Sequence, residues 1–252
     1  MDEQIERIAS SRNPRIREEQ IVELVPYIAS KQTGINENEV RALIKLVTAL
    51  FRAVCARDEL DGRKVKALTT KFRDAGRRSA PWRPTSSRVP GRPQDGSDGN
   101  RISRWLLPQD HKFYAAEVTA TLVEVKYVLQ TLSMANAPDI SAYNIRNAFT
   151  PWLLEHDLVP GEYLDPVQLI PINFMDFLED PRSVQSGHIY PLDRGGVHHP
   201  DNTFLMLFRS NQIQGNLTVV ELINLMGEIV QRHEHARAEG LPLEALIRQK
   251  TS

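Results

Sequence analysis

One stretch of the chain, residues 186–218, restricts the fold more than any other, because apolar runs and turn-forming residues alternate there over short distances. The apolar runs predict a strand over residues 184–192 and a return strand over residues 203–208. Between them, the sequence Asp-Arg-Gly-Gly at residues 193–196 is typical of a turn. A short helix that contains Asn211 is expected after the second strand. The stretch therefore predicts a strand, a loop, a strand and a helix in immediate succession.

The same stretch resembles the motif of the HNH, or ββα-metal, nuclease family. The family motif runs His-Ile-x-Pro, then Gly-Gly, then an Asn, and then an Asn or His that opens a helix. The matching residues here are His188, Ile189, Pro191, Gly195, Gly196, Asn202 and Asn211, with Gly215 after them. Asn202 lies fourteen positions after His188 and Asn211 nine positions after Asn202, which is the family's usual spacing. The resemblance covers residues 184–218 of a chain of 252.

Phosphodiester hydrolysis needs a base that activates water and a cation that neutralises charge on the phosphate and the leaving oxygen. The resemblance implies that His188, at the end of the first strand, is this base; an unperturbed imidazole has a pKa of ~6.5, close to working pH. It also implies that Asn202 ties the loop and supports the base. Asn211 would coordinate a divalent cation through its amide oxygen, and oxygen ligands suit Mg²⁺ or Mn²⁺ better than zinc.

The chain departs from the family at Gly187, because most HNH motifs place Asp, Glu or His directly before the base as a second metal ligand. One explanation is a site with a single protein ligand and several waters, as in the related nonspecific nucleases whose motif reads Asp-Arg-Gly-His. The sequence Ser-Gly-His at residues 186–188 resembles the end of that motif. The other explanation is a ligand from elsewhere, for which the candidates near in sequence are His199, Asp201, Asp176 and Asp180. We favour the first.

The rest of the chain is predicted to be mostly helical. Asn36 with Glu39 three residues later is typical of a capping box, and the apolar residues behind it recur at helical spacing as far as Cys55, which we expect in the core. Thr218 and Glu221 predict a second capping box. Further helices are expected over residues 16–28, 65–72, 110–134, 141–156 and 165–178, the last with Asp165 as its N-cap and Pro166 at its first position. The single cysteine excludes an intrachain disulfide and any zinc site that needs two thiolates.

A basic segment separates the helical part from the rest. Residues 63–92 hold ten Lys or Arg against one acid, Asp74, and residues 79–100 are rich in Pro, Gly and Ser. Because a phosphodiesterase motif occurs in the same chain, this segment is interpreted as a nucleic-acid contact. The candidate phosphate-binding residues are Arg77, Arg78, Arg83, Arg88 and Arg92, together with Arg209 before Asn211. His198 and His199 share a turn with Pro200 and are expected on an exposed loop.

These observations predict an α+β protein, a mostly α-helical chain with a C-terminal ββα-metal unit. The expected parts are a helical region at 1–78, a basic loop or linker at 79–105 and a nuclease domain at 106–252 with its ββα core at about 184–216. The expected function is cleavage of double-stranded DNA by a restriction or defence enzyme, with a homodimer cutting both strands. The alternatives are a nonspecific DNA or RNA nuclease effector and a DNA-binding protein with a decayed HNH unit. No apolar stretch approaches the ~18–20 residues that span a bilayer, and we expect a cytoplasmic protein.

Overall fold

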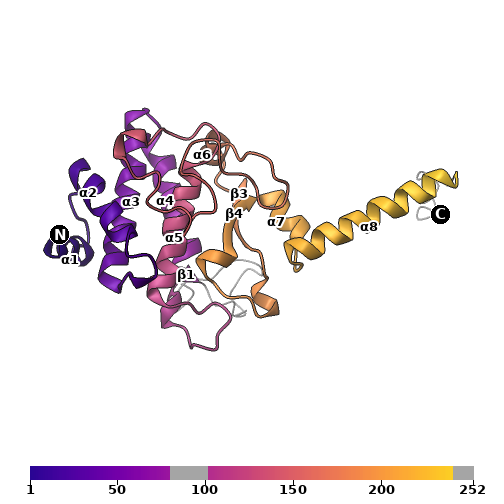
Figure 1. The fold of residues 1–252 in the computed structure, drawn as a ribbon, viewed down its shortest axis with the longest axis horizontal. Helices are drawn as coiled ribbons and strands as arrows, with labels where there is room; N and C mark the ends of the chain where they lie inside the picture. The colour runs from indigo at the N-terminus through magenta and orange to yellow at the C-terminus, as the bar shows by residue number, and fades with distance from the viewer. Residues whose placement is uncertain (80–101, 241–252) are drawn as a thin grey trace, which may run out of the picture.

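A computed structural model describes residues 1–79 and 102–240 of the chain (Figure 1). The N-terminal part consists of four helices: α1 (Asp2–Ser10), α2 (Glu18–Ala29), α3 (Glu37–Arg57) and α4 (Gly62–Gly76). Helix α3 begins where the sequence predicted, because the side chain of Asn36 accepts from the Glu39 amide at 3.0 Å and the Glu39 carboxylate accepts from the Asn36 amide at 2.9 Å. Cys55 lies in the core of this part, as expected.

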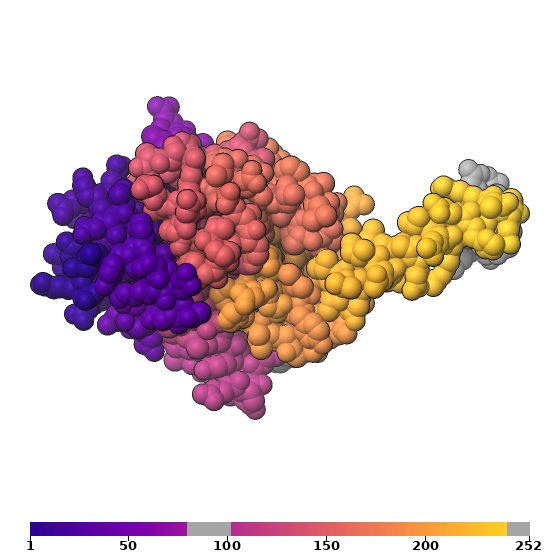
Figure 2. All heavy atoms as spheres, viewed as in Figure 1, coloured from indigo at the N-terminus to yellow at the C-terminus, as the bar shows by residue number. Residues whose placement is uncertain are grey.

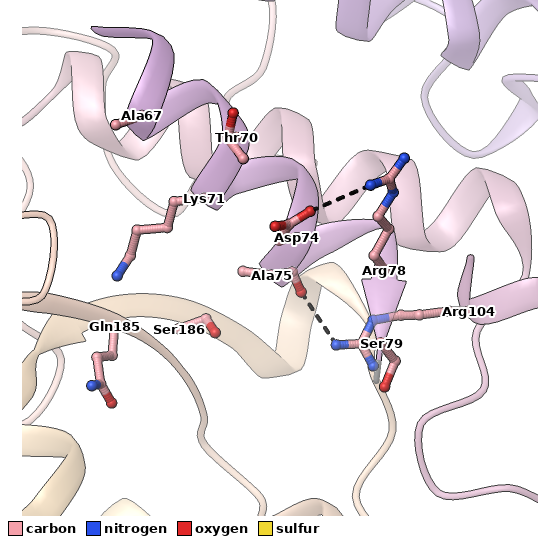
Figure 3. A pocket seen from close by; sticks show the side chains of 10 residues that line it. All are labelled: Ala67, Thr70, Lys71, Asp74, Ala75, Arg78, Ser79, Arg104, Gln185 and Ser186. Atoms are coloured by element: carbon pink, nitrogen blue, oxygen red, sulfur yellow. Dashed lines mark hydrogen bonds and ion pairs between the residues drawn. The ribbon is translucent and has the colours of Figure 1, made fainter. Parts of the chain in front are cut away.

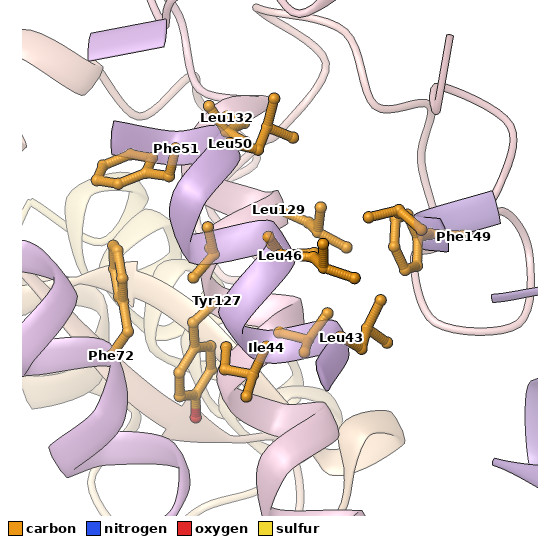
Figure 4. Close-up of a cluster of buried hydrophobic side chains, with 14 of the residues drawn as sticks. Leu43, Ile44, Leu46, Leu50, Phe51, Phe72, Tyr127, Leu129, Leu132 and Phe149 are labelled. Atoms are coloured by element: carbon orange, nitrogen blue, oxygen red, sulfur yellow. The ribbon is translucent and has the colours of Figure 1, made fainter. Parts of the chain in front are cut away.

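The central element is α5 (Glu117–Leu132), which is enclosed on nearly every side and packs against α3, α4 and the C-terminal hairpin. One continuous hydrophobic core joins it to the N-terminal helices (Figure 4). Phe51 of α3 and Phe72 of α4 meet edge to face there, with ring centroids 5.8 Å apart. Tyr127 and Leu129 of α5 belong to the same cluster. Since these side chains are fully buried, α5 is held firmly in the core and supports the C-terminal hairpin, which packs against it.

Three predicted helices differ from the structure. Residues 110–116 form turns, so that α5 begins only at Glu117. Residues 141–156 contain the 3₁₀ turn Ser141–Tyr143 and are otherwise irregular, since Pro151 has no amide hydrogen to donate within a helix. Residues 165–178 are helical only in α6 (Phe174–Glu179), whose N-cap is Asn173 and not Asp165. The expectation of helices over these ranges was therefore wrong in extent.

The C-terminal part contains the predicted strands and helices. Strand β3 (Val184–His188) is shorter than the predicted 184–192, and β4 (Thr203–Leu207) pairs with it antiparallel. They are followed by α7 (Phe208–Gln214) and α8 (Val219–Ala238). A second small sheet pairs β1 (Arg78–Ser79) with β2 (Ile102–Ser103). The predicted α+β class is confirmed, and among the described residues no helix is long and apolar enough to cross a membrane.

Helix α8 projects away from the rest of the molecule (Figures 1 and 2). It begins at Thr218 with the predicted capping box, since Thr218 Oγ1 accepts from the Glu221 amide at 3.2 Å and the Glu221 carboxylate accepts from the Thr218 amide at 2.8 Å. Leu222 is buried at its base, but the apolar residues further along are about half exposed, for example Ile223 at 51% and Val230 at 54%. The described residues of the chain do not cover this apolar face of α8, and exposed apolar surface of this kind is typical of an interaction site.

Candidate active site

The hairpin of β3 and β4 presents the motif residues on two faces. In this antiparallel pair Gln185 stands opposite Met206, and successive side chains point to opposite sides. Gln185 and Gly187 therefore share one face, and His188 lies on the other. Helix α7 packs on the first face, where Asn211 donates from Nδ2 to Gln185 Oε1 at 2.9 Å. The imidazole of His188, the last residue of β3, points away from α7 and toward His198.

The loop between the strands explains the Gly-Gly and Asn positions of the motif. Gly195 has a φ of 90°, which L side chains rarely adopt, and a Cβ on Gly196 would collide with the carbonyl oxygen of Tyr190. Asn202 then spans the loop: its Oδ1 accepts from the Tyr190 amide at 2.7 Å, and its Nδ2 donates to the carbonyls of Tyr190 at 3.0 Å and Val197 at 2.8 Å. Asn202 thus ties the loop, while its part in catalysis stays a prediction.

His188 is hydrogen-bonded to a second histidine. Its Nε2 lies 3.3 Å from Nδ1 of His198, and Nε2 of His198 lies 2.8 Å from the carbonyl oxygen of Gly76 at the end of α4. His198 is only 2% exposed, so the expectation of an exposed loop was wrong for this residue and correct for His199. The side chain of His198 points inward to the Gly76 carbonyl, which lies 122 positions away in the chain. Because the two residues are so far apart in sequence, no local pattern could have predicted this contact.

A buried arginine sets the charge around the two histidines. Arg104 is 7% exposed and donates to the carbonyls of Gly76 at 2.9 Å, Ala75 at 3.2 Å and Phe113 at 3.2 Å. Burial, and then the positive charge of Arg104, lower the pKa of His188 to about 4. The same two causes, in the same order, lower the pKa of His198 well below its ordinary value. Both imidazoles are therefore neutral at pH 7, as a general base must be.

Helix α7 is fixed to the end of β3 by a glutamine that the sequence analysis did not single out. Gln214 donates from Nε2 to the carbonyls of His188 at 2.8 Å and Leu217 at 3.0 Å. The side of α7 toward β4 is held by Asp165, whose carboxylate accepts from Ser210 Oγ at 2.9 Å and from the Leu207 amide at 2.8 Å. These bonds, one at each end of α7, set the position of Asn211 between them.

Among the motif residues, Asn211 is the one whose side chain could bind a cation. Among the described residues, no group of three or more His, Cys, Asp or Glu side chains is placed to hold a metal ion. His199 and Asp201 pair with each other at 3.4 Å, and Asp176 and Asp180 lie at the surface. Within the same residues, Asn211 Oδ1 has no hydrogen-bond donor, so this amide oxygen fits a hard cation that keeps most of its waters.

The predicted phosphate-binding arginines lie in different settings. Arg209 is exposed at the start of α7, and Arg77 forms an ion pair with the buried carboxylate of Glu124. Arg78 lies 3.7 Å from Asp74 and lines a cleft of about 650 Å³ between α4 and β3 (Figure 3). Three further candidates, Arg83, Arg88 and Arg92, lie outside the described residues, as does most of the predicted basic loop at 79–105.

The cleft of Figure 3 continues the hairpin's surface toward α4. Its lining from α4 and β1 contains Lys71, Arg78 and Asp74, and its lining from β3 contains Gln185 and Ser186. Arg104 also borders it, as do several small side chains. Since Ser186 lies two positions before His188 on the same strand, the cleft runs along the strand that ends at the candidate base. Its polar lining contains more cations than acids.

Comparisons with known proteins add little to this geometry. No protein-family model matches the chain, and no curated protein matches it. One solved structure, described as a crystal structure of a type II restriction endonuclease, superposes with a TM-score of 0.41 and 19% sequence identity. The superposition covers 53% of this chain and 62% of that one. The candidate site must therefore be judged on its own residues.

Proposed function

We propose that this chain is a metal-dependent endonuclease of the HNH class, which hydrolyses phosphodiester bonds of double-stranded DNA. The observation that carries the proposal is the setting of His188. A neutral, largely enclosed imidazole stands at the end of β3 with one ring nitrogen held by His198. The main-chain carbonyl of the same residue is bonded to α7, the helix that carries Asn211. This is the arrangement that a positioned general base requires.

The chain's own residues would divide the work as follows. His188 accepts a proton from a water molecule as the water oxygen bonds to phosphorus and the bond to one ester oxygen breaks. Asn211 offers its amide oxygen to the cation, and Gln214 keeps α7 against the end of β3. Asn202 holds the loop between the two strands in place. A bound Mg²⁺ or Mn²⁺ would neutralise charge on the phosphate and on the leaving oxygen.

The cleft between α4 and β3 supports DNA as the substrate. Arg78 lines it directly, and the chain segment that follows Ser79 carries Arg83, Arg88 and Arg92. Cations along a groove neutralise phosphates without regard to sequence, which supplies most of nonspecific DNA affinity. The helical N-terminal part is larger than catalysis needs, and we assign it to recognition of the target. A restriction or defence enzyme is therefore the specific role proposed, acting as a homodimer.

The decisive experiment is plasmid cleavage by the purified protein with Mg²⁺, with Mn²⁺ and with EDTA, comparing wild type with His188→Ala. Positioned acid–base catalysis is worth ~10²–10⁴-fold, so the variant is expected to lose at least ~100-fold in cleavage rate while still binding DNA. EDTA is expected to stop wild-type cleavage. The matched control is His235→Ala, which removes an exposed histidine of α8 and should leave cleavage unchanged.

Each other outcome of this experiment identifies a different function. A variant that retains more than about a tenth of wild-type cleavage, or full activity in EDTA, contradicts the proposal. Discrete fragments from a defined plasmid support a restriction enzyme, whereas a smear supports a nonspecific effector nuclease. DNA binding with no cleavage under any divalent ion identifies a decayed HNH unit.

A further inference from the structure

We propose that His198 is a positioning residue, which holds the ring of His188 in the tautomer that carries its proton on Nε2 and leaves Nδ1 as the base. The inference rests on the proposed function, because it names the nitrogen that would take the proton from water. The HNH resemblance includes no histidine at this position, and the proposal is built from four groups in the structure: His188, His198, the Gly76 carbonyl and Arg104.

The direction of the hydrogen bonds follows from the Gly76 carbonyl, which can only accept. His198 Nε2, 2.8 Å away, must therefore carry the ring proton of this histidine. A neutral imidazole has a single ring proton, so His198 Nδ1 is left with a lone pair and can only accept. At 3.3 Å the atom that faces it is His188 Nε2, which must then be the donor. The remaining nitrogen of His188, Nδ1, carries the lone pair.

Both rings stay in the neutral form that this reasoning requires. His198 is enclosed, and its pKa and that of His188 are lowered by burial and by the Arg104 charge. Within the described residues, Nδ1 of His188 has no hydrogen-bond partner, while its Nε2 has one. The hydrogen bond therefore distinguishes the two tautomers, because only one of them gives His198 a donor to accept from.

The position of His198 is itself fixed from two directions. On one side, Asn202 donates to the carbonyl of Val197, the residue before His198. On the other side, Gly76 packs so closely on Glu124 of α5 that a Cβ at Gly76 would overlap the Glu124 backbone. The motif asparagine and the end of α4 thus hold the same imidazole between them. Asn202 can therefore affect the position of His188 indirectly, through His198, without contacting His188 itself.

Three substitutions of His198 separate the hydrogen bond from the volume of the ring. Asn places an amide oxygen near the position of Nδ1 and can still accept from His188, whereas Leu fills space without accepting. Gln places an amide nitrogen near Nε2 and preserves chiefly the bond to Gly76. We expect kcat to fall by about 10–100-fold in His198→Leu with KM unchanged, as for other residues that orient a catalytic group. His198→Asn should recover most of the loss and His198→Gln less.

The tautomer itself is measured on the wild-type protein, by ¹⁵N chemical shifts of the His188 ring nitrogens near pH 7. The expected spectrum shows a protonated Nε2 and an unprotonated Nδ1, and a mixture of tautomers in His198→Leu. A wild-type His188 protonated on Nδ1 would overturn the proposal, and so would unchanged kcat in His198→Leu when the tautomer has shifted. If the wild-type protein cleaves no DNA, the proposed function fails, while the spectrum still decides which nitrogen carries the proton.

Discussion

Met206 occupies the space into which a side chain at Gly187 would point. A Cβ built on Gly187 would overlap the Sδ and Cε atoms of Met206, which is fully buried on β4 one strand away. The two residues lie on the face of the hairpin that carries Gln185 and meets α7. The position where most HNH motifs carry a metal ligand is therefore filled here from the opposite strand by a thioether, which is a poor ligand for Mg²⁺.

This relationship predicts the effect of the substitution Gly187→Asp. The single substitution places a carboxylate against Met206 and should lower the free energy of unfolding by roughly 1–3 kcal/mol, the usual cost of overpacking a core. The double variant Gly187→Asp, Met206→Ala removes the obstruction and turns the carboxylate toward Asn211. If the native site works with one protein ligand, we expect the double variant to need the same or a lower metal concentration for half-maximal cleavage.

Met206→Ala alone is the control for the altered packing. A large rise in the metal requirement of the double variant, with a normal melting transition, would contradict the one-ligand site and point to a ligand from elsewhere in the chain.

The pH dependence of cleavage follows from the lowered pKa of His188. The base is active when unprotonated, so activity is present above its pKa and is lost as the pH falls through it. An ordinary histidine would lose activity tenfold per unit below about pH 6.5. Because burial and Arg104 bring the pKa of His188 to about 4, kcat/KM, which reports the free enzyme, should stay flat from pH 7 to about 5.5. An acid limb centred near pH 6.5 would contradict a base with a lowered pKa.

Asp165 is expected to be a major contributor to stability. Its buried carboxylate accepts from the amides of Val167 at 2.9 Å and Gln168 at 2.7 Å, as well as from Leu207 and Ser210 of the hairpin and α7. Asp165→Ala would leave these donors buried without acceptors, at ~1–3 kcal/mol for each that finds no water. We expect a loss of roughly 3 kcal/mol or more in urea unfolding.

The same substitution at the exposed Asp157 is the matched control and should stay within about 0.5 kcal/mol of wild type. A similar effect of the two substitutions would mean that the Asp165 bonds contribute nothing net.

Asp165 also shows why parts of the fold were not predictable from sequence. Asp165 followed by Pro166 is a good helix start, and the carboxylate does cap the next two amides, but it is shared with Leu207 and Ser210, more than forty positions later. The turn does not extend into a helix, because Leu169 has a left-handed φ of 54°. The capping boxes at Asn36 and Thr218 were predictable because both partners lie within three residues.

The candidate site divides in the same way. The hairpin, the glycine turn and α7 follow from local patterns, and the structure places them where they were expected. The setting of His188 does not, because His198 and Arg104 meet at the Gly76 carbonyl from positions far apart in the chain. His198 precedes an exposed histidine in a loop, and nothing in this local sequence indicates that it will be buried.

The basic segment is expected to bind phosphates, and salt dependence measures it. Each phosphate contact adds about −0.9 to the slope of log K against log salt for duplex DNA. Replacing Arg83, Arg88 and Arg92 with Ala should therefore weaken binding and flatten the slope by roughly two to three units. Cleavage at saturating DNA should be retained, because His188 and Asn211 are unchanged.

A control triple variant removes the same net charge elsewhere, at the exposed Arg7, Arg15 and Arg237. Its slope should match wild type. If the first triple variant also keeps the wild-type slope, the segment is a solvated linker, and the cleft lined by Lys71 and Arg78 becomes the remaining path for DNA.

The exposed face of α8 predicts self-association of the chain. Its residues recur at the spacing of a two-helix seam: Ile223, Met226, Ile229 and Val230 are exposed, and His233 ends the line. The half-buried Val219 and the buried Leu222 lie on the same line at the base of the helix. A second copy of the helix carries the same seam and could bury it. If the proposed nuclease cuts one strand with each ββα unit, a dimer would also supply the second site that a double-strand break needs.

The test compares two double variants that add equal charge to α8. Ile223→Glu with Met226→Glu places two carboxylates on the seam, whereas Asn224→Glu with Gln231→Glu places them off it, on exposed positions. By sedimentation at micromolar concentration, wild type and the second variant should be dimers and the first a monomer, because like charges cannot be buried against each other without a large cost. The monomer should convert supercoiled plasmid mainly to the nicked form, and the dimers to the linear form. A monomeric wild-type protein that still produces linear DNA in one binding event would contradict both the seam and the paired-site arrangement.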